Sequence, residues 1–208
     1  DKMSSNLLSN LRIILVVFLF VVIIMPGIMK IAVHINAMDI PNERKVHKHP
    51  IPRLGGLGIF FGFLLGYMLF CSQTPQMISI LIGSFILILV GSIDDINPIK
   101  PLPKFCGQLV AAAIVVYYGN VVMQDVSAYG LYINFGMLAK PITIIFILGV
   151  INCLNLIDGL DGLAGGIATI FFITISIIIS IMGIYNGLDA SLSLIMIGAT
   201  LGFLVYNF

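Results

Sequence analysis

The chain has 208 residues, of which only ten are Lys or Arg and nine are Asp or Glu, so charged residues make up 9% against roughly 25% in a soluble domain. Hydrophobic residues make up 60%, and the mean hydropathy is +1.15. This composition excludes a soluble globular domain and a disordered chain, and a net charge of +1 argues against a nucleic-acid binder. A multi-pass membrane protein is the class that remains.

Seven continuous apolar segments follow one another along the chain. They are approximately 11–33, 56–72, 77–93, 104–119, 137–154, 164–185 and 190–207. Because these runs do not alternate between polar and apolar residues, they predict helices rather than strands of a barrel. We therefore expect an all-α integral membrane protein, with residues 1–208 forming a single multi-pass domain of about seven spans.

The distribution of basic residues predicts the orientation of these spans. Seven of the ten Lys and Arg residues lie in or beside segments 34–55 and 94–103, counting Lys30, and three (Lys2, Arg12 and Lys140) do not. The positive-inside rule then places 34–55, 94–103 and 155–163 in the cytoplasm and the N-terminus outside. Residues 120–136 form the longest outer segment, and alternation around 126–133 predicts a short hairpin there.

Two adjacent carboxylates, Asp94 and Asp95, end the third apolar segment. Acids at a helix C-terminus oppose the helix dipole, and nothing in the sequence suggests a structural reward for placing them there. A solvated helix end is the alternative interpretation. Ionisable groups beside the membrane are functional candidates, and two carboxylates suit a base or a ligand of Mg²⁺.

A second polar cluster follows the fifth segment. Its members recur every third residue and are Asn152, Asn155, Asp158 and Asp161. This spacing keeps them on one slowly drifting stripe of a helix, and the neighbouring Gly159 would let backbone approach a ligand closely. Glycines that pack helices, with Asn and Asp as caps, are the structural alternative, but that leaves two carboxylates on the stripe unexplained.

The basic segment between the first two spans contains Lys45, His47 and Arg53. It acts as a positive-inside anchor, but cations on the same membrane face as a carboxylate cluster also suggest a doubly anionic phosphate substrate. Cations, acids and a glycine-rich turn on one face favour phosphoryl transfer, which depends on positioning and charge stabilisation.

Three blocks, in this order, carry a family resemblance. They are Pro41 to Gly56, then Gly91 to Asp95 with Lys104 to Gln108, and finally Asn152 to Gly166. With them the chain resembles the polyprenyl-phosphate N-acetylhexosamine-1-phosphate transferases, in particular the undecaprenyl-phosphate N-acetylglucosamine-1-phosphate transferases of glycosyltransferase family 4. The first block is more similar to the branch that uses UDP-N-acetylglucosamine or a related UDP-sugar than to the muramoyl-pentapeptide branch.

The resemblance implies that undecaprenyl phosphate attacks a UDP-sugar, giving UMP and an undecaprenyl-diphosphate sugar for a wall polysaccharide, teichoic acid or O-antigen. It implies an active site on the cytoplasmic face of a bacterial inner membrane, Mg²⁺ or Mn²⁺ as cofactor, and leaves a homodimer open. It also implies roles for ten residues: Asp94 and Asp95 as catalytic residues, Asp158 and Asp161 as metal ligands, and Lys45, His47, Arg53, Asn152, Asn155 and Gly159 as substrate-binding residues.

Members of that family usually have ten or eleven spans, with a later Met-Gly-Asp block and a His-rich loop, neither of which occurs in these 208 residues. We therefore expect the chain to correspond to the N-terminal part of the fold and to be inactive alone. A transporter is the rival class, although transporter sites usually lie near the membrane midplane on broken helices. A non-catalytic scaffold would leave the carboxylates unexplained.

Overall fold

The computed structural model describes residues 2–39, 51–52, 54–158, 162–183 and 187–207. They form two compact units. Unit 1 comprises Asp1–Ser72, Asp95–Asn97 and Ile157–Phe208, and unit 2 comprises Gln73–Asp94 and Pro98–Leu156.

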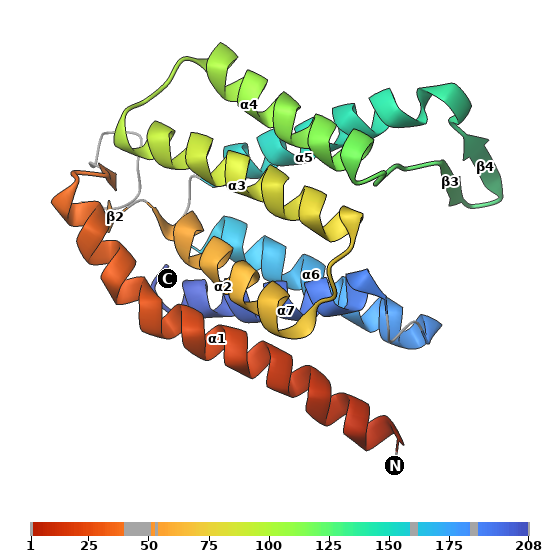
Figure 1. The fold of residues 1–208 in the computed structure, drawn as a ribbon, viewed down its shortest axis with the longest axis horizontal. Coiled ribbons are helices and arrows are strands. Elements are labelled where there is room, and N and C mark those ends of the chain that lie inside the picture. Colours follow the sequence, from red (N-terminus) through yellow and green to blue (C-terminus); the bar gives the residue numbers. More distant parts are fainter. Residues whose placement is uncertain (1, 40–50, 53, 159–161, 184–186, 208) are drawn as a thin grey trace. The chain divides into compact units, whose positions relative to one another are not determined.

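Within the described residues, seven α-helices correspond one to one to the seven predicted segments (Figure 1). They are α1 (Lys2–His34), α2 (Gly55–Phe70), α3 (Pro75–Ile96), α4 (Pro101–Ala113), α5 (Ala139–Ile157), α6 (Leu163–Met182) and α7 (Leu188–Leu204). The helical fold class is therefore confirmed. Five helical stretches are long and apolar enough to cross a membrane, whereas α2 and α7, with 16 and 17 residues, are shorter.

Unit 1 contains α1, α2, α6 and α7, and glycines allow its helices to approach closely. A Cβ atom on Gly198 of α7 would lie 2.6 Å from the Ile14 carbonyl oxygen of α1, and one on Gly202 would lie 2.9 Å from that of Phe18. These two glycines form a G-x-x-x-G pattern, which lets the backbones of two helices meet. On α2, a Cβ atom on Gly62 would lie 2.5 Å from the Val21 side chain of α1.

This close packing predicts that Gly198→Ala destabilises the protein. Alanine favours a helix over glycine by about 1 kcal/mol, but at position 198 its methyl group would press on a backbone oxygen that cannot rotate away, and overpacking typically costs about 1–3 kcal/mol. Gly149→Ala on α5 is the matched control, because nothing lies within 4 Å of a Cβ atom there. Thermal unfolding in detergent should show a lower midpoint for the first variant only; equal midpoints would contradict close packing of α1 and α7.

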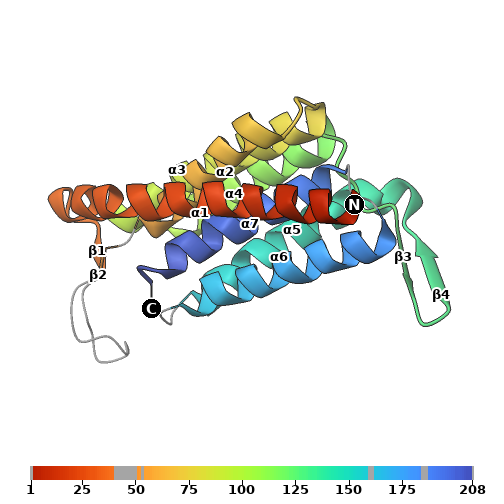
Figure 2. The same cartoon turned by 90° about the horizontal axis from the view of Figure 1, so that it is seen from below.

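Unit 1 also contains a buried side-chain hydrogen bond and a short pair of strands. The Thr169 hydroxyl of α6 donates a hydrogen bond to the Thr200 hydroxyl of α7 at 2.8 Å, and both side chains are buried. At the end of α1, strand β1 (Met38–Asp39) pairs antiparallel with β2 (Ile51–Pro52), as Figure 2 shows. The two ends of the basic segment are therefore held together, a pairing that the sequence analysis did not predict.

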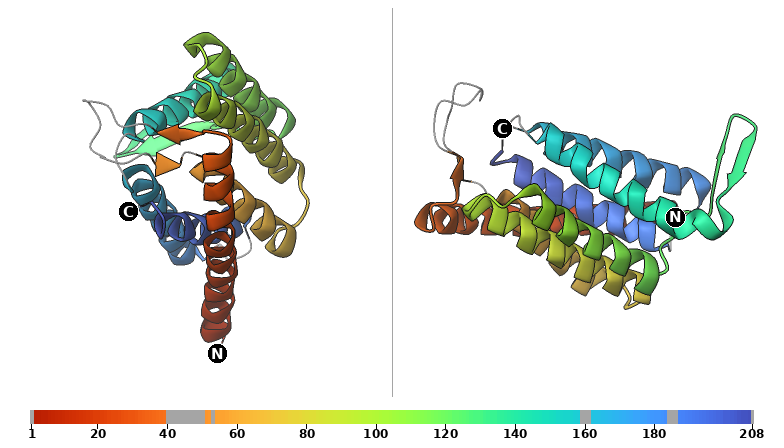
Figure 3. Two further views of the ribbon diagram at one scale, coloured as in Figure 1. Left: turned by 90° about the vertical axis from the view of Figure 1, so that its left-hand side faces the viewer. Right: turned by 90° about the horizontal axis from the view of Figure 1, so that it is seen from above.

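Unit 2 contains α3, α4 and α5 together with the predicted hairpin. A π-helical turn (Ile114–Tyr118) extends α4, and a 3-10 turn (Gly136–Leu138) precedes α5. Between them β3 (Asp125–Ala128) pairs antiparallel with β4 (Leu131–Asn134), and the hairpin projects beyond the start of α5 (Figure 3). Tyr129 and Gly130 both have positive φ, 51° and 81°, as the two central residues of a type I′ turn require. The hairpin prediction is confirmed.

The predicted orientation can be tested with the three cysteines. Cys71 directly follows α2 and is partly exposed. Cys106 lies on α4 and Cys153 on α5, and both side chains are exposed. We expect a membrane-impermeant thiol reagent on intact cells to reach Cys71, if any, and not Cys106 or Cys153, because basic loops favour the cytoplasm. A Lys48→Cys variant should react only after permeabilisation; its labelling from outside would invert the predicted topology.

Candidate active site

Asp94 connects the end of α3 to the start of α4 within unit 2. Its Oδ1 atom accepts a hydrogen bond from the Ile99 backbone N–H at 3.0 Å, and its Oδ2 atom lies 2.8 Å from Lys104 Nζ. The side chains of Asp94 and Lys104 are 24% and 32% exposed. Asp94 thus has a structural role at this helix end, contrary to the expectation from the sequence, because its carboxylate closes the loop and pairs with a lysine. The hydrogen bond from Ile99 and the ion pair with Lys104 both hold the carboxylate in place.

Asp95 is the half-buried neighbour of Asp94 in the last turn of α3. Successive residues of a helix point about 100° apart. The two carboxylates therefore face different directions, and Lys104 pairs with the Asp94 carboxylate. Two different roles for the pair follow more naturally than one shared role.

One face of α4 joins the second and third sequence blocks. Lys104 and Gln108 are four residues apart and so lie on the same side of α4. Lys104 binds Asp94 of α3, and Gln108 Oε1 accepts a hydrogen bond of 2.9 Å from Asn152 Nδ2 of α5. Gln108 is only 3% exposed. The sequence analysis did not select Lys104 or Gln108 as site residues, although their spacing of four was a usable signal.

The rest of the third block lies at and after the end of α5. Asn155 is exposed one turn after Asn152, and Asp158 occupies the turn that follows the helix. Burial raises the pKa of the Asp158 carboxyl group above its ordinary value. Gly162, with φ 71°, then precedes the first residue of α6, so a new helix begins five residues after Asp158, at Leu163.

The first and third blocks both contact the end of α7 within unit 1. A Cβ atom on Gly55, at the start of α2, would collide with the Phe203 ring, and one on Gly165, near the start of α6, would lie 3.3 Å from the same ring. The C-terminal end of α7 therefore packs against the starts of both helices. Gly55 and Gly165 therefore serve helix packing, which for Gly165 is the structural alternative considered for the glycines of the third block.

Five of the predicted site residues lie outside the described residues. They are Lys45, His47, Arg53, Gly159 and Asp161. Within the part of the chain that the structure describes, no three His, Cys, Asp or Glu side chains gather as a metal site. Mg²⁺ needs only one or two carboxylates when substrate phosphates supply further oxygens, so the hard-oxygen pair of Asp158 and Asp161 fits this ion by its chemistry.

Apolar helices with carboxylate, ammonium and amide side chains near their ends are typical of an integral membrane protein. Residues 77–208 match the family model described as glycosyl transferase family 4. The chain belongs to this family, and with its apolar helices it is a multi-pass membrane protein. The family resemblance seen in the three blocks is thereby confirmed.

Named relatives show the same relationship. The chain is 42% identical over 199 residues to the probable undecaprenyl-phosphate N-acetylglucosaminyl 1-phosphate transferase of Bacillus subtilis, covering 93% of this chain and 54% of the relative. It is 30% identical over 197 residues to the decaprenyl-phosphate N-acetylglucosaminephosphotransferase of Mycobacterium tuberculosis, covering 86% and 48%. An undecaprenyl-phosphate alpha-N-acetylglucosaminyl 1-phosphate transferase of Yersinia pestis is 28% identical over 169 residues, covering 80% and 46%. The chain thus spans about half the length of the curated relatives it matches.

Proposed function

We propose that the protein transfers N-acetylglucosamine-1-phosphate from UDP-N-acetylglucosamine to undecaprenyl phosphate. An oxygen of the lipid phosphate attacks the sugar-bearing phosphorus, the bond from that phosphorus to the UMP oxygen breaks, and UMP leaves. The products are an undecaprenyl-diphosphate sugar and UMP. The three relatives named above carry polyprenyl-phosphate N-acetylglucosamine phosphotransfer in their names, which supports this reaction.

The observation that carries the proposal is the pair of contacts made by α4. Lys104 with Asp94 and Gln108 with Asn152 join two sequence blocks that the family resemblance assigns to one site. A carboxylate held by a lysine stays in place, as a group that positions or activates the lipid phosphate must. In this proposal Asp94 and Asp95 act on that phosphate, and Asn152, Asn155 and Gly159 bind the nucleotide sugar.

The remaining predicted residues would stabilise the negative charge of the substrate phosphates. Phosphoryl transfer places negative charge on oxygens that cations can neutralise, so Lys45, His47 and Arg53 would hold substrate phosphates. Asp158 and Asp161 would hold Mg²⁺, or Mn²⁺ in its place, and the bound ion would neutralise charge on the diphosphate. The site would face the cytoplasm of a bacterial inner membrane, and the product would enter synthesis of a wall polysaccharide, teichoic acid or O-antigen.

A vesicle assay separates this function from its rivals. The complete protein in proteoliposomes should release UMP from UDP-N-acetylglucosamine only when undecaprenyl phosphate and Mg²⁺ are present. Release from UDP-N-acetylmuramoyl-pentapeptide instead would assign the muramoyl-pentapeptide branch. Transmembrane flux of a solute without UMP release would indicate a transporter and would overturn the proposal.

A further inference from the structure

The Leu148 carbonyl oxygen and the buried amide of Gln108 together fix the orientation of Asn152. Asn152 Nδ2 donates one hydrogen bond to the Leu148 carbonyl oxygen at 2.8 Å and another to Gln108 Oε1 at 2.9 Å. A backbone carbonyl can only accept, so the atom of Asn152 that faces Leu148 must be the amide nitrogen. Both amide hydrogens are then used, and Oδ1 is the atom that Asn152 has left to offer.

We infer that Gln108 is a positioning residue that makes Asn152 present a carbonyl oxygen, and hence a hydrogen-bond acceptor, to the nucleotide sugar. The inference rests on the proposed function and adds to it the chemistry of one contact. Asn152 is exposed, whereas Gln108 is buried and cannot itself reach a substrate. The group that Asn152 recognises must therefore be a donor, such as an N–H or O–H of the UDP-sugar.

The test uses Gln108→Met, which keeps the length of the side chain but removes the acceptor. We expect KM for the UDP-sugar to rise on the order of tenfold with little change in kcat, which marks a lost binding contact. Asn152→Ala should have a similar effect, and the double variant should be no worse than Asn152→Ala alone. If Gln108→Met raised KM equally in the wild type and in Asn152→Ala, the inference would be overturned. An unchanged KM with a lowered unfolding midpoint would also overturn it, because Gln108 would then be only structural.

A second measurement keeps the inference separate from the proposed function. In protein labelled with ¹⁵N-asparagine, the side-chain amide protons of Asn152 should exchange slowly with solvent, and faster in Gln108→Met. Fast exchange in both the wild type and Gln108→Met would overturn the positioning role of Gln108, whether or not the protein releases UMP. Slow exchange in a protein that releases no UMP would sustain the orientation of Asn152 and overturn the proposed function and, with it, the assigned ligand.

An independent observation concerns Pro26 in the middle of α1. Proline has no backbone N–H, so the carbonyl oxygen of Val22, four residues earlier, loses its helical donor. In a membrane-spanning helix no water replaces that donor, and an unsatisfied carbonyl is strongly unfavourable. The Tyr206 hydroxyl donates a hydrogen bond of 3.0 Å to this same oxygen.

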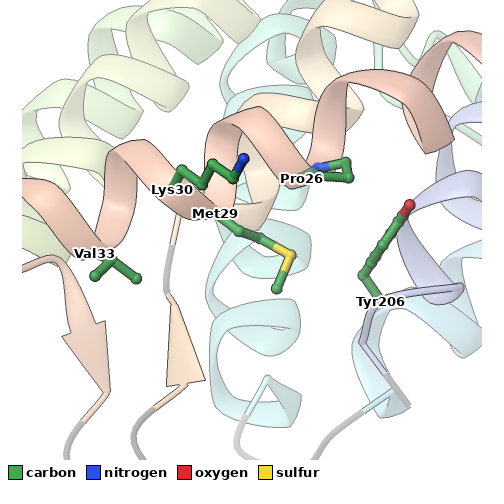
Figure 4. A pocket seen from close by; sticks show the side chains of 5 residues that line it. All are labelled: Pro26, Met29, Lys30, Val33 and Tyr206. Carbon is green, nitrogen blue, oxygen red and sulfur yellow. The ribbon is translucent and has the colours of Figure 1, made fainter.

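Tyr206 lies in the turn that follows α7, in which its own N–H donates to the Phe203 carbonyl oxygen at 3.0 Å. Figure 4 shows its hydroxyl directed toward α1 beside Pro26. An open cavity of about 440 Å³ lies beside this part of α1, lined by Pro26, Met29, Lys30, Val33 and Tyr206. The tyrosine thus reaches across this cavity to α1.

We propose that Tyr206 is a latch that replaces the hydrogen-bond donor missing at Pro26 and so fixes the C-terminal part of α1 to the end of α7. The part of α1 beyond Pro26 carries Lys30 and leads into β1, where the basic segment begins. The latch therefore fixes the direction in which this segment leaves the membrane helix. The Tyr206 latch does not depend on the proposed reaction.

A double-mutant cycle tests the latch. Tyr206→Phe removes only the hydroxyl and should lower the unfolding midpoint by a few degrees, because Val22 loses its donor. In a Pro26→Ala background the new N–H at position 26 supplies that donor, so the same Tyr206→Phe change should have almost no effect. Tyr132→Phe is the control, a tyrosine of β4 that is well exposed in the structure. An equal shift for Tyr206→Phe in both backgrounds would overturn the latch.

Electron paramagnetic resonance adds a readout of geometry. Spin labels at Leu15 and Ile31, two exposed positions on α1 on either side of Pro26, would be placed in a variant whose three native cysteines are replaced. The distance distribution should broaden in Tyr206→Phe and stay narrow in both variants that carry Pro26→Ala. An unchanged distribution in Tyr206→Phe would show that the hydroxyl does not fix the part of α1 that follows Pro26.

Discussion

Replacing Asp95 or Asp158 by asparagine in the complete enzyme is expected to lower its turnover at least about 10²-fold, while the protein stays folded in the membrane. Asparagine keeps the size of the side chain and much of its hydrogen bonding but removes its negative charge. Loss of a group that moves a proton or stabilises charge typically has an effect of this size. The measurement is UMP release by purified variants at saturating UDP-sugar, undecaprenyl phosphate and Mg²⁺.

The matched control is Asp125→Asn, a carboxylate of the exposed hairpin. It removes the same charge from the same protein without touching a predicted site residue, and it should keep the turnover of the wild type. Normal turnover in Asp95→Asn or Asp158→Asn would remove the role proposed for that residue. Loss of turnover in all three variants would point to net charge or folding rather than to the site.

The helices and the hairpin could be predicted from the sequence because their signals are local. Each apolar run is continuous over one helix, and the turn of the hairpin is marked by Gly130, which accepts positive φ without strain. The close approach of α7 to α1 is different. Gly198 and Gly202 are visible as a pattern, but the partner backbone lies more than 180 residues away along the chain, at Ile14 and Phe18. No local signal names that partner.

The same limit applies to the site. The sequence marks Asp94 as unusual because it opposes a helix dipole, but the compensation comes from Ile99 and Lys104 across a loop that has no periodicity. Gln108 and Asn152 are 44 residues apart, and only the packing of α4 against α5 makes them partners. Sequence patterns therefore indicate which polar residues are unusual, and the tertiary structure shows which of them contact one another.

The contact between Asp94 and Lys104 allows the structural and catalytic roles of Asp94 to be separated. Lys104→Met and Asp94→Asn both remove the ion pair, and each should lower stability by on the order of 1 kcal/mol, because the pair is partly exposed. If Asp94 also acts on the lipid phosphate, Asp94→Asn should reduce turnover at least about 10²-fold, whereas Lys104→Met should reduce it only about tenfold through imperfect positioning.

Lys140→Met is the control for this comparison, because it removes a lysine of the same unit whose ammonium group lies 5.0 Å from the centre of the Tyr117 ring rather than beside a carboxylate. Its turnover should match that of the wild type. Unfolding midpoints and UMP release of the same preparations give both quantities at once. If Asp94→Asn and Lys104→Met lose turnover equally, Asp94 acts only by closing the loop between α3 and α4. The catalytic carboxylate of this pair would then be Asp95 alone, and the different directions that two successive helix residues face would explain why only one of them reaches the substrate.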